Sequence, residues 1–460
     1  MASSSSLGSG FLLRPASRLP ALVVPRSSPL FLGIDVGTSG VRLMLRDCDD
    51  ALIASVREPL PPGHRRGAAS EQDPEHWWRA LVTACRRLPP APRARIAALA
   101  IDGTSGTVLL TDAAGRPLHP ALMYDDARAQ EEAEALRAVA PADSPARGPA
   151  TGLARLLWLA KQPFARHARH ALHQADWLLG RLAGRFGDTD PNNALKTGYD
   201  PLARRWPAWL EKTDLPPEWL PRVHPAGTPL ARIAPVMAAE LGLPESTLLV
   251  AGTTDSTAAF LATGAREPGE AVTCLGSTLV LKVLCARPVA APEYGIYSQP
   301  LGERWLAGGA SNCGGAVLRR FFSDARLREL EPRLCPERST GLQYTPLPGI
   351  GERFPVNDPT LAPVLEPRPD DDAVFLQGLL ESLAEVEREG YRRLAACGAP
   401  WPASIRTTGG GAGNRAWTAI RAARLGVPLL PAEQTEAAWG AAGLAREGWL
   451  RKKEQGEQDA

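Results

Sequence analysis

The stretch FLGIDVGTSGVRLMLRD at residues 31–47 alternates apolar residues with small or polar ones on either side of a Gly-Thr-Ser-Gly turn. This pattern predicts a β-hairpin whose loop is built from small residues. The stretch AVTCLGSTLVLKVL at residues 271–284 repeats the pattern around a Gly-Ser-Thr turn. Two such hairpins at equivalent places in successive halves of the chain indicate a duplicated domain.

Strands and helices alternate between the two hairpins. The patterns predict an amphipathic helix at 75–88, a buried strand followed by a hairpin at 95–118, and helices at 151–162 and 170–184. This alternation is typical of a mixed α/β layer architecture.

The length of 460 residues also favours two domains, because single domains rarely exceed about 250 to 300 residues. Residues 214–232 are rich in proline, so we place the boundary there, with a first domain at 31–228 and a second at 229–450. The polar residues 451–460 are expected to form a frayed tail.

Composition excludes several classes of partner. The chain has 44% hydrophobic and 22% charged residues and a net charge of +2, which is the composition of a globular protein. It has no block of Lys and Arg interleaved with aromatics, so neither a nucleic acid nor a membrane surface is expected as a partner. No stretch approaches the roughly 18 consecutive apolar residues that a membrane-spanning helix needs. The oligomeric state stays open.

The cysteines and histidines give no sign of a metal or disulfide site. The seven cysteines contain no Cys-x-x-Cys pair, which indicates a reducing compartment. His167, His170 and His173 have helical spacing beside two arginines and are predicted to lie on a solvated helix face.

Residues 1–30 are rich in serine, carry three arginines and lack acidic residues. This composition is typical of an organelle transit peptide, which would direct the protein to the chloroplast, with the mitochondrion as the alternative. A disordered tail without a targeting role is the other interpretation.

Two small-residue turns could approach a phosphate. Asp35 ends the first apolar strand, and Gly37 and Gly40 leave room for the amides and hydroxyls of Thr38 and Ser39 to donate to phosphate oxygens. The turn Cys274-Leu-Gly-Ser-Thr278 offers similar groups. Each turn taken alone could equally be structural.

Two further clusters follow predicted strands in the second half. The glycine-rich run Thr407-Thr-Gly-Gly-Gly-Ala-Gly-Asn414 precedes a predicted helix, where backbone N–H groups can face a phosphate or a base. It matches neither a Walker loop nor a dinucleotide fingerprint. Asp255 follows the apolar strand 248–251 and could act chemically or simply cap the next helix.

Taken in order, these clusters resemble the FGGY carbohydrate kinase family over nearly all of residues 31–448. Four further segments occur in the family's order: Glu71–Trp78, Met123–Arg128, Asp176–Leu178 and Asn193–Asp200. The resemblance implies a two-domain actin-like ATPase fold, of the ribonuclease H-like class seen in hexokinase and actin, with sugar and ATP in the interdomain cleft.

The resemblance also implies roles for individual residues. Asp255 would be the general base, and Asp35 would help to hold Mg²⁺ and touch the sugar. The groups implied to hold ATP are Gly37, Thr38 and Ser39 in one domain, with Gly276, Ser277, Thr278, Gly410, Gly411 and Asn414 in the other. Phosphoryl transfer needs mainly alignment and charge neutralisation, which this set could supply.

One departure from the family bears on the substrate. Xylulokinases carry a Gln-Met-His-Gly turn where this chain has Gly103-Thr-Ser-Gly106, so Ser105 stands in place of a sugar-binding His, and Tyr124 replaces a usual Trp. This resembles the plant and cyanobacterial D-ribulose kinases and implies D-ribulose as the acceptor, with D-xylulose as the alternative.

Two rival classes are a catalytically silent sugar or nucleotide sensor and an actin-like chaperone or filament ATPase. The complete set of loops and both aspartates argue against a silent sensor, and the sugar-kinase segments argue against a chaperone or filament protein.

Overall fold

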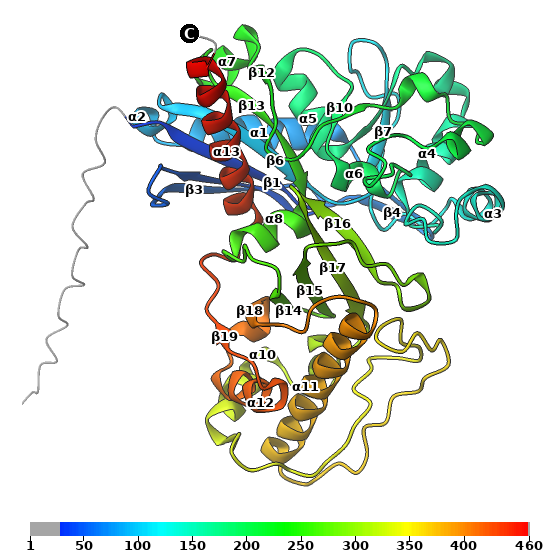
Figure 1. Cartoon of the computed structure of the whole chain (residues 1–460), viewed down its shortest axis with the longest axis vertical. Coiled ribbons are helices and arrows are strands. Elements are labelled where there is room, and N and C mark those ends of the chain that lie inside the picture. Colours follow the sequence, from blue (N-terminus) through cyan, green and yellow to red (C-terminus); the bar gives the residue numbers. More distant parts are fainter. Residues whose placement is uncertain (1–27, 459–460) are drawn as a thin grey trace, which may run out of the picture.

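The computed structural model describes residues 28–458, which form two lobes, drawn one above the other in Figure 1. The first lobe contains a six-stranded sheet in the order β12-β13-β6-β1-β2-β3. Its strands are β1 (Leu30–Val36), β2 (Gly40–Arg46), β3 (Leu52–Pro59), β6 (Ile96–Gly103), β12 (Pro229–Arg232) and β13 (Leu248–Thr254). The three central strands β1, β6 and β13 run parallel, so their carboxyl ends meet at one edge of the sheet.

The second lobe contains a six-stranded sheet in the order β16-β17-β15-β14-β18-β19. Its strands are β14 (Glu270–Leu275), β15 (Leu279–Cys285), β16 (Tyr297–Leu301), β17 (Arg304–Ser311), β18 (Ser404–Thr408) and β19 (Leu429–Leu430). Both predicted hairpins are present, as β1–β2 and β14–β15, and each pairs with a third antiparallel strand and one parallel strand. The predicted duplication is therefore visible in the topology.

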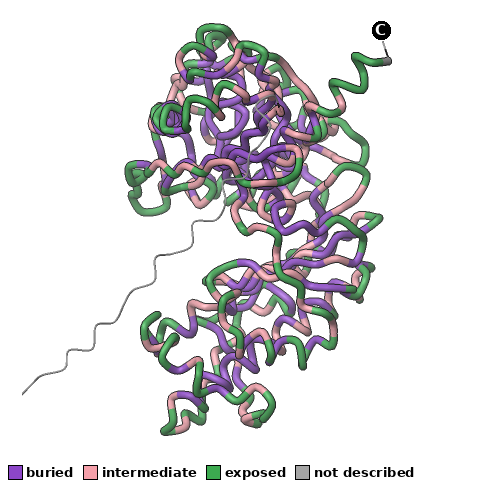
Figure 2. Tube along the Cα trace, turned by 90° about the vertical axis from the view of Figure 1, so that its left-hand side faces the viewer, coloured by how far each residue is buried: buried purple, intermediate pink, exposed green. Residues whose placement is uncertain are grey.

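Each lobe has a separate buried core, and buried residues gather inside both lobes in Figure 2. The first sheet contacts α1 (Pro74–Arg87), α5 (Gln174–Ala183) and, from a distant part of the chain, α13 (Ala437–Gln458), which also packs on α8 (Asp255–Ala262). The second sheet contacts α11 (Asp372–Ala396), which packs on α12 (Arg415–Leu425). The remaining α-helices of the described residues are α2 (Pro90–Arg93), α3 (Gln130–Val139), α4 (Gly152–Ala160), α6 (Pro191–Leu195), α7 (Pro235–Leu241), α9 (Gly315–Arg319) and α10 (Asp324–Leu330).

Close packing of α13 depends on glycines. A Cβ at Gly33 of β1 would collide with the carbonyl oxygen of Ala438, and a Cβ at Gly440 would collide with that of Ala258 in α8. These contacts bring the start of α13 against the first sheet, although α13 follows the whole second lobe in the sequence (Figure 1).

A smaller sheet extends the first lobe. It has the order β4-β5-β8-β7-β9, and two short strands, β10 and β11, pair separately. The bounds are β4 (His64–Arg66), β5 (Ala69–Gln72), β7 (Val108–Thr111), β8 (Ala121–Leu122), β9 (His170–His173), β10 (Asp188–Thr189) and β11 (Arg222–Val223).

The chain crosses between the sheets later than residue 228, where the sequence placed the boundary. Strands β12 and β13 lie beyond that residue yet belong to the first sheet, and the crossing falls between α8 and β14. The proline-rich stretch was a poor marker because its last residues form β12, a strand of the first sheet.

Three local predictions were wrong. Residues 170–173 form β9 and not a helix, since they complete the small sheet by pairing with β7. His173 is fully buried instead of solvated, and its ring bonds Asp176 Oδ2 at 2.6 Å and Thr197 Oγ1 at 2.9 Å. The expected frayed tail is helical, because α13 continues to Gln458.

Other predictions concern cysteines, membranes and targeting. All seven cysteines are free thiols, as expected. None of the helices between residues 28 and 458 is long and apolar enough to cross a membrane. The predicted transit peptide lies almost wholly in residues 1–27, outside the described residues, and stays a prediction.

Candidate active site

A cavity of about 560 Å³ lies at the carboxyl ends of the parallel strands in the first lobe. It is lined by Asp35, Gly37, Thr38, Arg42, Thr104, Ser105, Tyr124, Lys196, Asp255, Ser256, Ala259, Thr435, Glu436 and Ala437. Asp35 and Asp255, which lie far apart in the sequence, therefore share one cavity. Open α/β sheets bind ligands at this edge, where the chain leaves the strands.

Three carboxyl groups meet at this edge. Asp35 is near the end of β1, Asp102 occupies the paired position on β6, and Asp255 begins α8 directly after β13. Asp102 was missed by the sequence reasoning. Its signal was nonetheless present, since an isolated Asp followed by a glycine ends an apolar strand at Ile101-Asp-Gly103, much as Asp35 ends β1.

Asp102 is fully buried, and within the described residues its oxygens receive no hydrogen bond from a donor group. Burial raises its pKa well above the usual range, and the nearby charges of Asp35 and Asp255 raise it further. Burial and these charges therefore favour the protonated form of Asp102, whose proton can be shared with the adjacent Asp35 carboxylate.

Asp35 is held by an arginine. The Arg42 guanidinium donates to Asp35 Oδ2 at 2.8 Å, and its Nε lies 3.6 Å from Glu436. Burial raises the pKa of Asp35, while the bond and charge of Arg42 oppose that rise. This ion pair orients the Asp35 carboxylate inside the cavity.

Asp255 is oriented by its own helix. Its Oδ1 accepts a hydrogen bond from the backbone N–H of Ser256 at 2.6 Å, at the first turn of α8. Burial raises the pKa of Asp255, the charge of Asp35 adds to this, and the Ser256 N–H and two lysines oppose it. Thr254 is the residue before the helix, so Asp255 is not its N-cap, and its carboxylate faces the cavity.

Besides Asp255, four of the residues that the resemblance implies to bind ligand line this cavity. They are Asp35, Gly37, Thr38 and Ser105. Ser39 is exposed at the tip of the same turn and does not line it. Tyr124 lines the cavity as well.

The remaining predicted residues gather on the second lobe. Because Cys274 of β14 pairs with Thr408 of β18, the turn at Gly276, Ser277 and Thr278 lies beside the glycine-rich loop. That loop packs closely, since a Cβ at Gly409 would press on the backbone of Leu275 and one at Gly411 on the Trp417 ring. Gly410 has open space around it, and none of these groups lines the 560 Å³ cavity.

Asn414 has a structural contact that the sequence reasoning did not assign. Its Oδ1 accepts from the backbone N–H of Trp417 at 2.7 Å and so caps the N-terminus of α12. The backbone at this helix start adjoins the glycine-rich loop.

A second cavity of about 350 Å³ adjoins the first at Lys196. It is lined by Lys196, Val280, Leu281, Lys282, Tyr294, Gly295, Tyr297, Gln299, Leu306, Gly308, Gly309, Ala310 and Arg353. All but Lys196 belong to the second lobe, so the two cavities span the junction of the lobes. Sequence reasoning missed both lysines, which stand in no motif.

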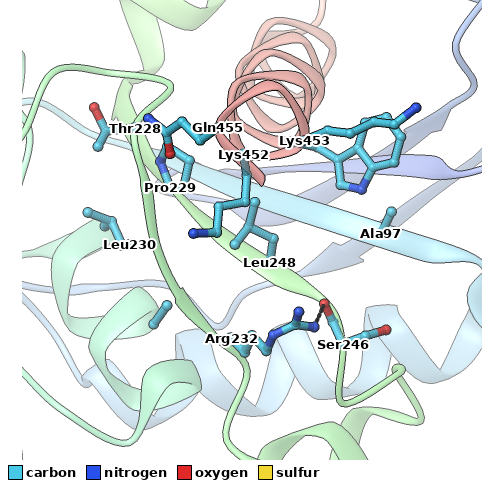
Figure 3. A pocket seen from close by; sticks show the side chains of 12 residues that line it. Ala97, Thr228, Pro229, Leu230, Arg232, Ser246, Leu248, Lys452, Lys453 and Gln455 are labelled. Carbon is cyan, nitrogen blue, oxygen red and sulfur yellow. Dashed lines mark hydrogen bonds between the residues drawn. The ribbon is translucent and has the colours of Figure 1, made fainter. Parts of the chain in front are cut away.

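A cavity of about 650 Å³ lies elsewhere, beside the C-terminal part of α13 (Figure 3). Its charged lining groups are Arg232, Lys452 and Lys453, and it contains no carboxylate. Lysines in the last turns of a helix ordinarily offset the helix dipole. With no base and no predicted site residue, this cavity is not the place for the chemistry.

The site can accommodate a magnesium ion brought with a nucleotide. The described residues hold no cluster of three or more His, Cys, Asp or Glu that would bind a metal alone. Mg²⁺ usually binds through one or two carboxylates together with water and substrate phosphates. Asp35, one of the carboxylates that line the cavity, could bind the ion in this way.

The chain matches both domain models of the FGGY family of carbohydrate kinases, the N-terminal domain at residues 30–262 and the C-terminal domain at 271–447. It is 27% identical over 409 residues to a xylulose kinase of Escherichia coli, covering 84% of this chain and 83% of that protein. A xylulose kinase of Streptomyces coelicolor is 28% identical over 454 residues, covering 91% and 87%.

Solved structures agree with these sequence matches. The crystal structure of a kinase from Brucella ovis, described as a xyloylose kinase, superimposes with a TM-score of 0.83 at 26% identity and covers 92% of this chain and 91% of its own. The predicted α/β fold with two actin-like ATPase domains is thereby confirmed.

Proposed function

Because the chain belongs to the FGGY family of carbohydrate kinases, we propose that it phosphorylates a pentulose with ATP, and that the acceptor is D-ribulose. The observation that carries the proposal is the shared cavity of Asp35, Ser105 and Asp255. Its lining includes an oriented carboxylate and a small hydroxyl side chain, and its volume of about 560 Å³ leaves room for a sugar.

Asp255 is the general base. It accepts the proton of the attacking sugar hydroxyl while the new O–P bond forms and the bond from phosphorus to the bridging oxygen of ATP breaks, leaving that electron pair on ADP. Its ionised form is required, and the Ser256 N–H stabilises that form against burial.

ATP is held by turns from both lobes. Gly37, Thr38 and Ser39 bind phosphate from the first lobe and Gly276, Ser277 and Thr278 from the second, while Gly410, Gly411 and Asn414 support the adenosine. Asp35 would hold Mg²⁺, which supplies charge neutralisation to the phosphates when bound. Since the second-lobe groups do not line the cavity of Asp255, the lobes must move closer during turnover.

The acceptor assignment rests on Ser105 and Tyr124, both at the cavity wall. A hydroxyl and a phenol at these places bond sugar oxygens, and discrimination between epimers depends on such bonds. D-Xylulose is the second candidate, because the relatives described above are named xylulose kinases.

The test is ADP release by the purified full chain with ATP, Mg²⁺ and separate additions of D-ribulose, D-xylulose, L-ribulose, L-xylulose and glycerol. We expect the highest kcat/KM with D-ribulose. A higher value with another acceptor would reassign the substrate, and no turnover with any of them would favour the silent sensor.

The role of Asp255 is tested with Asp255→Asn. This variant should lose sugar-dependent ADP release and still bind ATP, because the amide cannot take up the proton. Asp143→Asn, at an exposed position outside the site, is the matched control. Retained turnover in Asp255→Asn would refute its role as the base.

A further inference from the structure

Lys196 stands where the two cavities of the lobe junction meet. It follows α6 and lines both the 560 Å³ and the 350 Å³ cavity. Between residues 28 and 458, its ammonium makes no hydrogen bond or ion pair with a protein group. Its positive charge nevertheless acts on Asp255 and lowers the pKa of that carboxyl.

The second lysine at the junction is differently engaged. Lys282 Nζ donates to the backbone carbonyl of Ser256 at 2.9 Å and to Gln299 Oε1 at 3.2 Å. The bond to Ser256 ties β15 of the second lobe to the first turn of α8, and the bond to Gln299 joins β15 to β16. Lys282 therefore uses two of its three donors on the protein, whereas Lys196 has its donors available for a ligand.

The short helix α6, which ends at Lys196, is held in place from both lobes. The carboxylate of Asp190 caps α6, and Asn192 donates from Nδ2 to Thr253 Oγ1 and to the carbonyl of Pro300, each at 3.0 Å. Thr253 lies on β13 just before Asp255, and Pro300 lies on β16. The Lys196 side chain packs beside Gly106, whose Cβ position would be 3.8 Å from Lys196 Cδ.

One of the cations that line the 560 Å³ cavity is not paired with any carboxylate of the described residues. The carboxylates of the cavity are Asp35, Asp255 and Glu436, and its cations are Arg42 and Lys196. Arg42 is already paired with Asp35 and lies near Glu436. A phosphoryl group arriving beside Asp255 would meet two further carboxylates, and Lys196 is the lining cation left to offset its charge.

The choice of lysine is also unusual for this chain. Of its 52 basic residues, only six are lysines: Lys161, Lys196, Lys212, Lys282, Lys452 and Lys453. Two of the six stand at the lobe junction. The lysine ammonium is a compact point charge, whereas the arginine guanidinium is planar with donors in a fixed arrangement. A phosphoryl group that moves during transfer is therefore better stabilised by lysine.

We propose that Lys196 is a catalytic residue whose ammonium contacts the phosphoryl group as it passes from ATP to the acceptor hydroxyl. The inference rests on the proposed kinase reaction. Lys196 keeps its protons and supplies positive charge, Asp255 takes the hydroxyl proton, and the electron pair of the broken P–O bond stays on ADP. Fixed charges aimed at developing charge are a large source of catalysis in a site shielded from water.

Kinetics with Lys196→Met and Lys196→Arg form the first test. We expect kcat to fall by about 100-fold in Lys196→Met, as for loss of one stabilising donor, with the KM for ATP little changed. Lys196→Arg should recover part of kcat. Lys161→Met is the control, because Lys161 pairs with Glu132 in the first lobe and lines neither cavity. A wild-type kcat in Lys196→Met would overturn the inference.

Nuclear magnetic resonance of the wild-type chain is the second test and does not depend on which sugar is used. With carbon-13 at lysine Cε, the chain gives six signals, which Lys→Arg variants assign. The Lys196 signal should move on adding ADP, Mg²⁺ and aluminium fluoride, a mimic of the transferring phosphoryl group, and much less with ADP and Mg²⁺ alone.

The two tests separate the inference from the pentulose assignment. If no pentulose is phosphorylated but the Lys196 signal responds to the mimic, the acceptor is wrong and the role of Lys196 stands. If a pentulose is phosphorylated and the Lys196 signal does not respond, the role of Lys196 is wrong.

Discussion

Asp102 on β6 lies in register with Asp35 on β1, so that two carboxyl groups meet beneath the cavity that Asp255 also faces. The partner positions differ in exposure to ligand: Asp35 lines the cavity, whereas Asp102 is fully enclosed. A protonated Asp102 can share its proton with Asp35 and thereby keep one carboxylate, and not two, at this end of the sheet.

Asp102→Asn should therefore stabilise the protein increasingly as pH rises. The folded-state pKa of Asp102 lies well above its ordinary value of 3.8, so the unfolded chain ionises first. In the wild type, the contribution of Asp102 to the free energy of unfolding is fully present below pH 3.8. It is lost as the pH rises through the pKa of Asp102 in the folded state. Asn cannot ionise and can still donate to Asp35.

The measurement is the difference in free energy of unfolding between Asp102→Asn and wild type, from about pH 3 to about pH 8. Asp143→Asn, at an exposed position, should give a much flatter difference. A difference for Asp102→Asn that does not grow with pH would show that Asp102 ionises normally.

Gly440→Ala should destabilise the packing of α13 on α8. The added Cβ would meet the backbone of Ala258, which is three residues from Asp255, so α8 must shift. We expect a loss of about 1 to 3 kcal/mol in denaturant unfolding and a lower kcat. Gly456→Ala is the matched control in the same helix.

Gly456 has open space where its Cβ would stand. Its replacement by Ala should be neutral or stabilise the helix by up to about 1 kcal/mol, because Gly is the weaker helix former. Equal effects of the two substitutions would contradict the close contact between α13 and α8.

Arg421→Met should strongly destabilise the second lobe. Arg421 donates to both oxygens of Glu387, at 2.6 and 2.7 Å, and both side chains are buried. Loss of one partner leaves a buried charge uncompensated and costs about 3 to 5 kcal/mol. Urea unfolding measures this loss.

The control for this pair is Arg137→Met, which breaks an exposed ion pair with Glu134 on α3. Such pairs contribute at most about 1 kcal/mol. The double substitution Arg421→Met with Glu387→Met should be more stable than Arg421→Met alone, because no charge is then left unpaired. A double variant as unstable as the single one would argue against the ion pair as the cause.

Asn414 can be separated into a capping role and a nucleotide role. Asn414→Ala removes the cap of α12 and should cost about 1 kcal/mol of stability, whereas Asn414→Ser can keep the cap. If Asn414 supports adenosine as proposed, both variants should raise the KM for ATP. An unchanged KM in Asn414→Ser would leave capping as its role.

Local patterns in the sequence were enough to predict the two hairpins, the strand that ends at Asp35 and the helix that follows Asp255. Alternation, small-residue turns and strand ends depend on neighbouring residues, so they can be interpreted without knowing the fold. The shared cavity of Asp35 and Asp255 could be expected only through the family resemblance.

Contacts between distant segments needed the tertiary structure. The return of α13 to the first sheet, the enclosure of Asp102 against Asp35 and the place of Lys196 between two cavities all join residues far apart in the chain. Burial and charge interactions depend on which residues are neighbours in three dimensions. Only the tertiary structure therefore shows which of the many polar side chains of the sequence lie at the junction of the lobes.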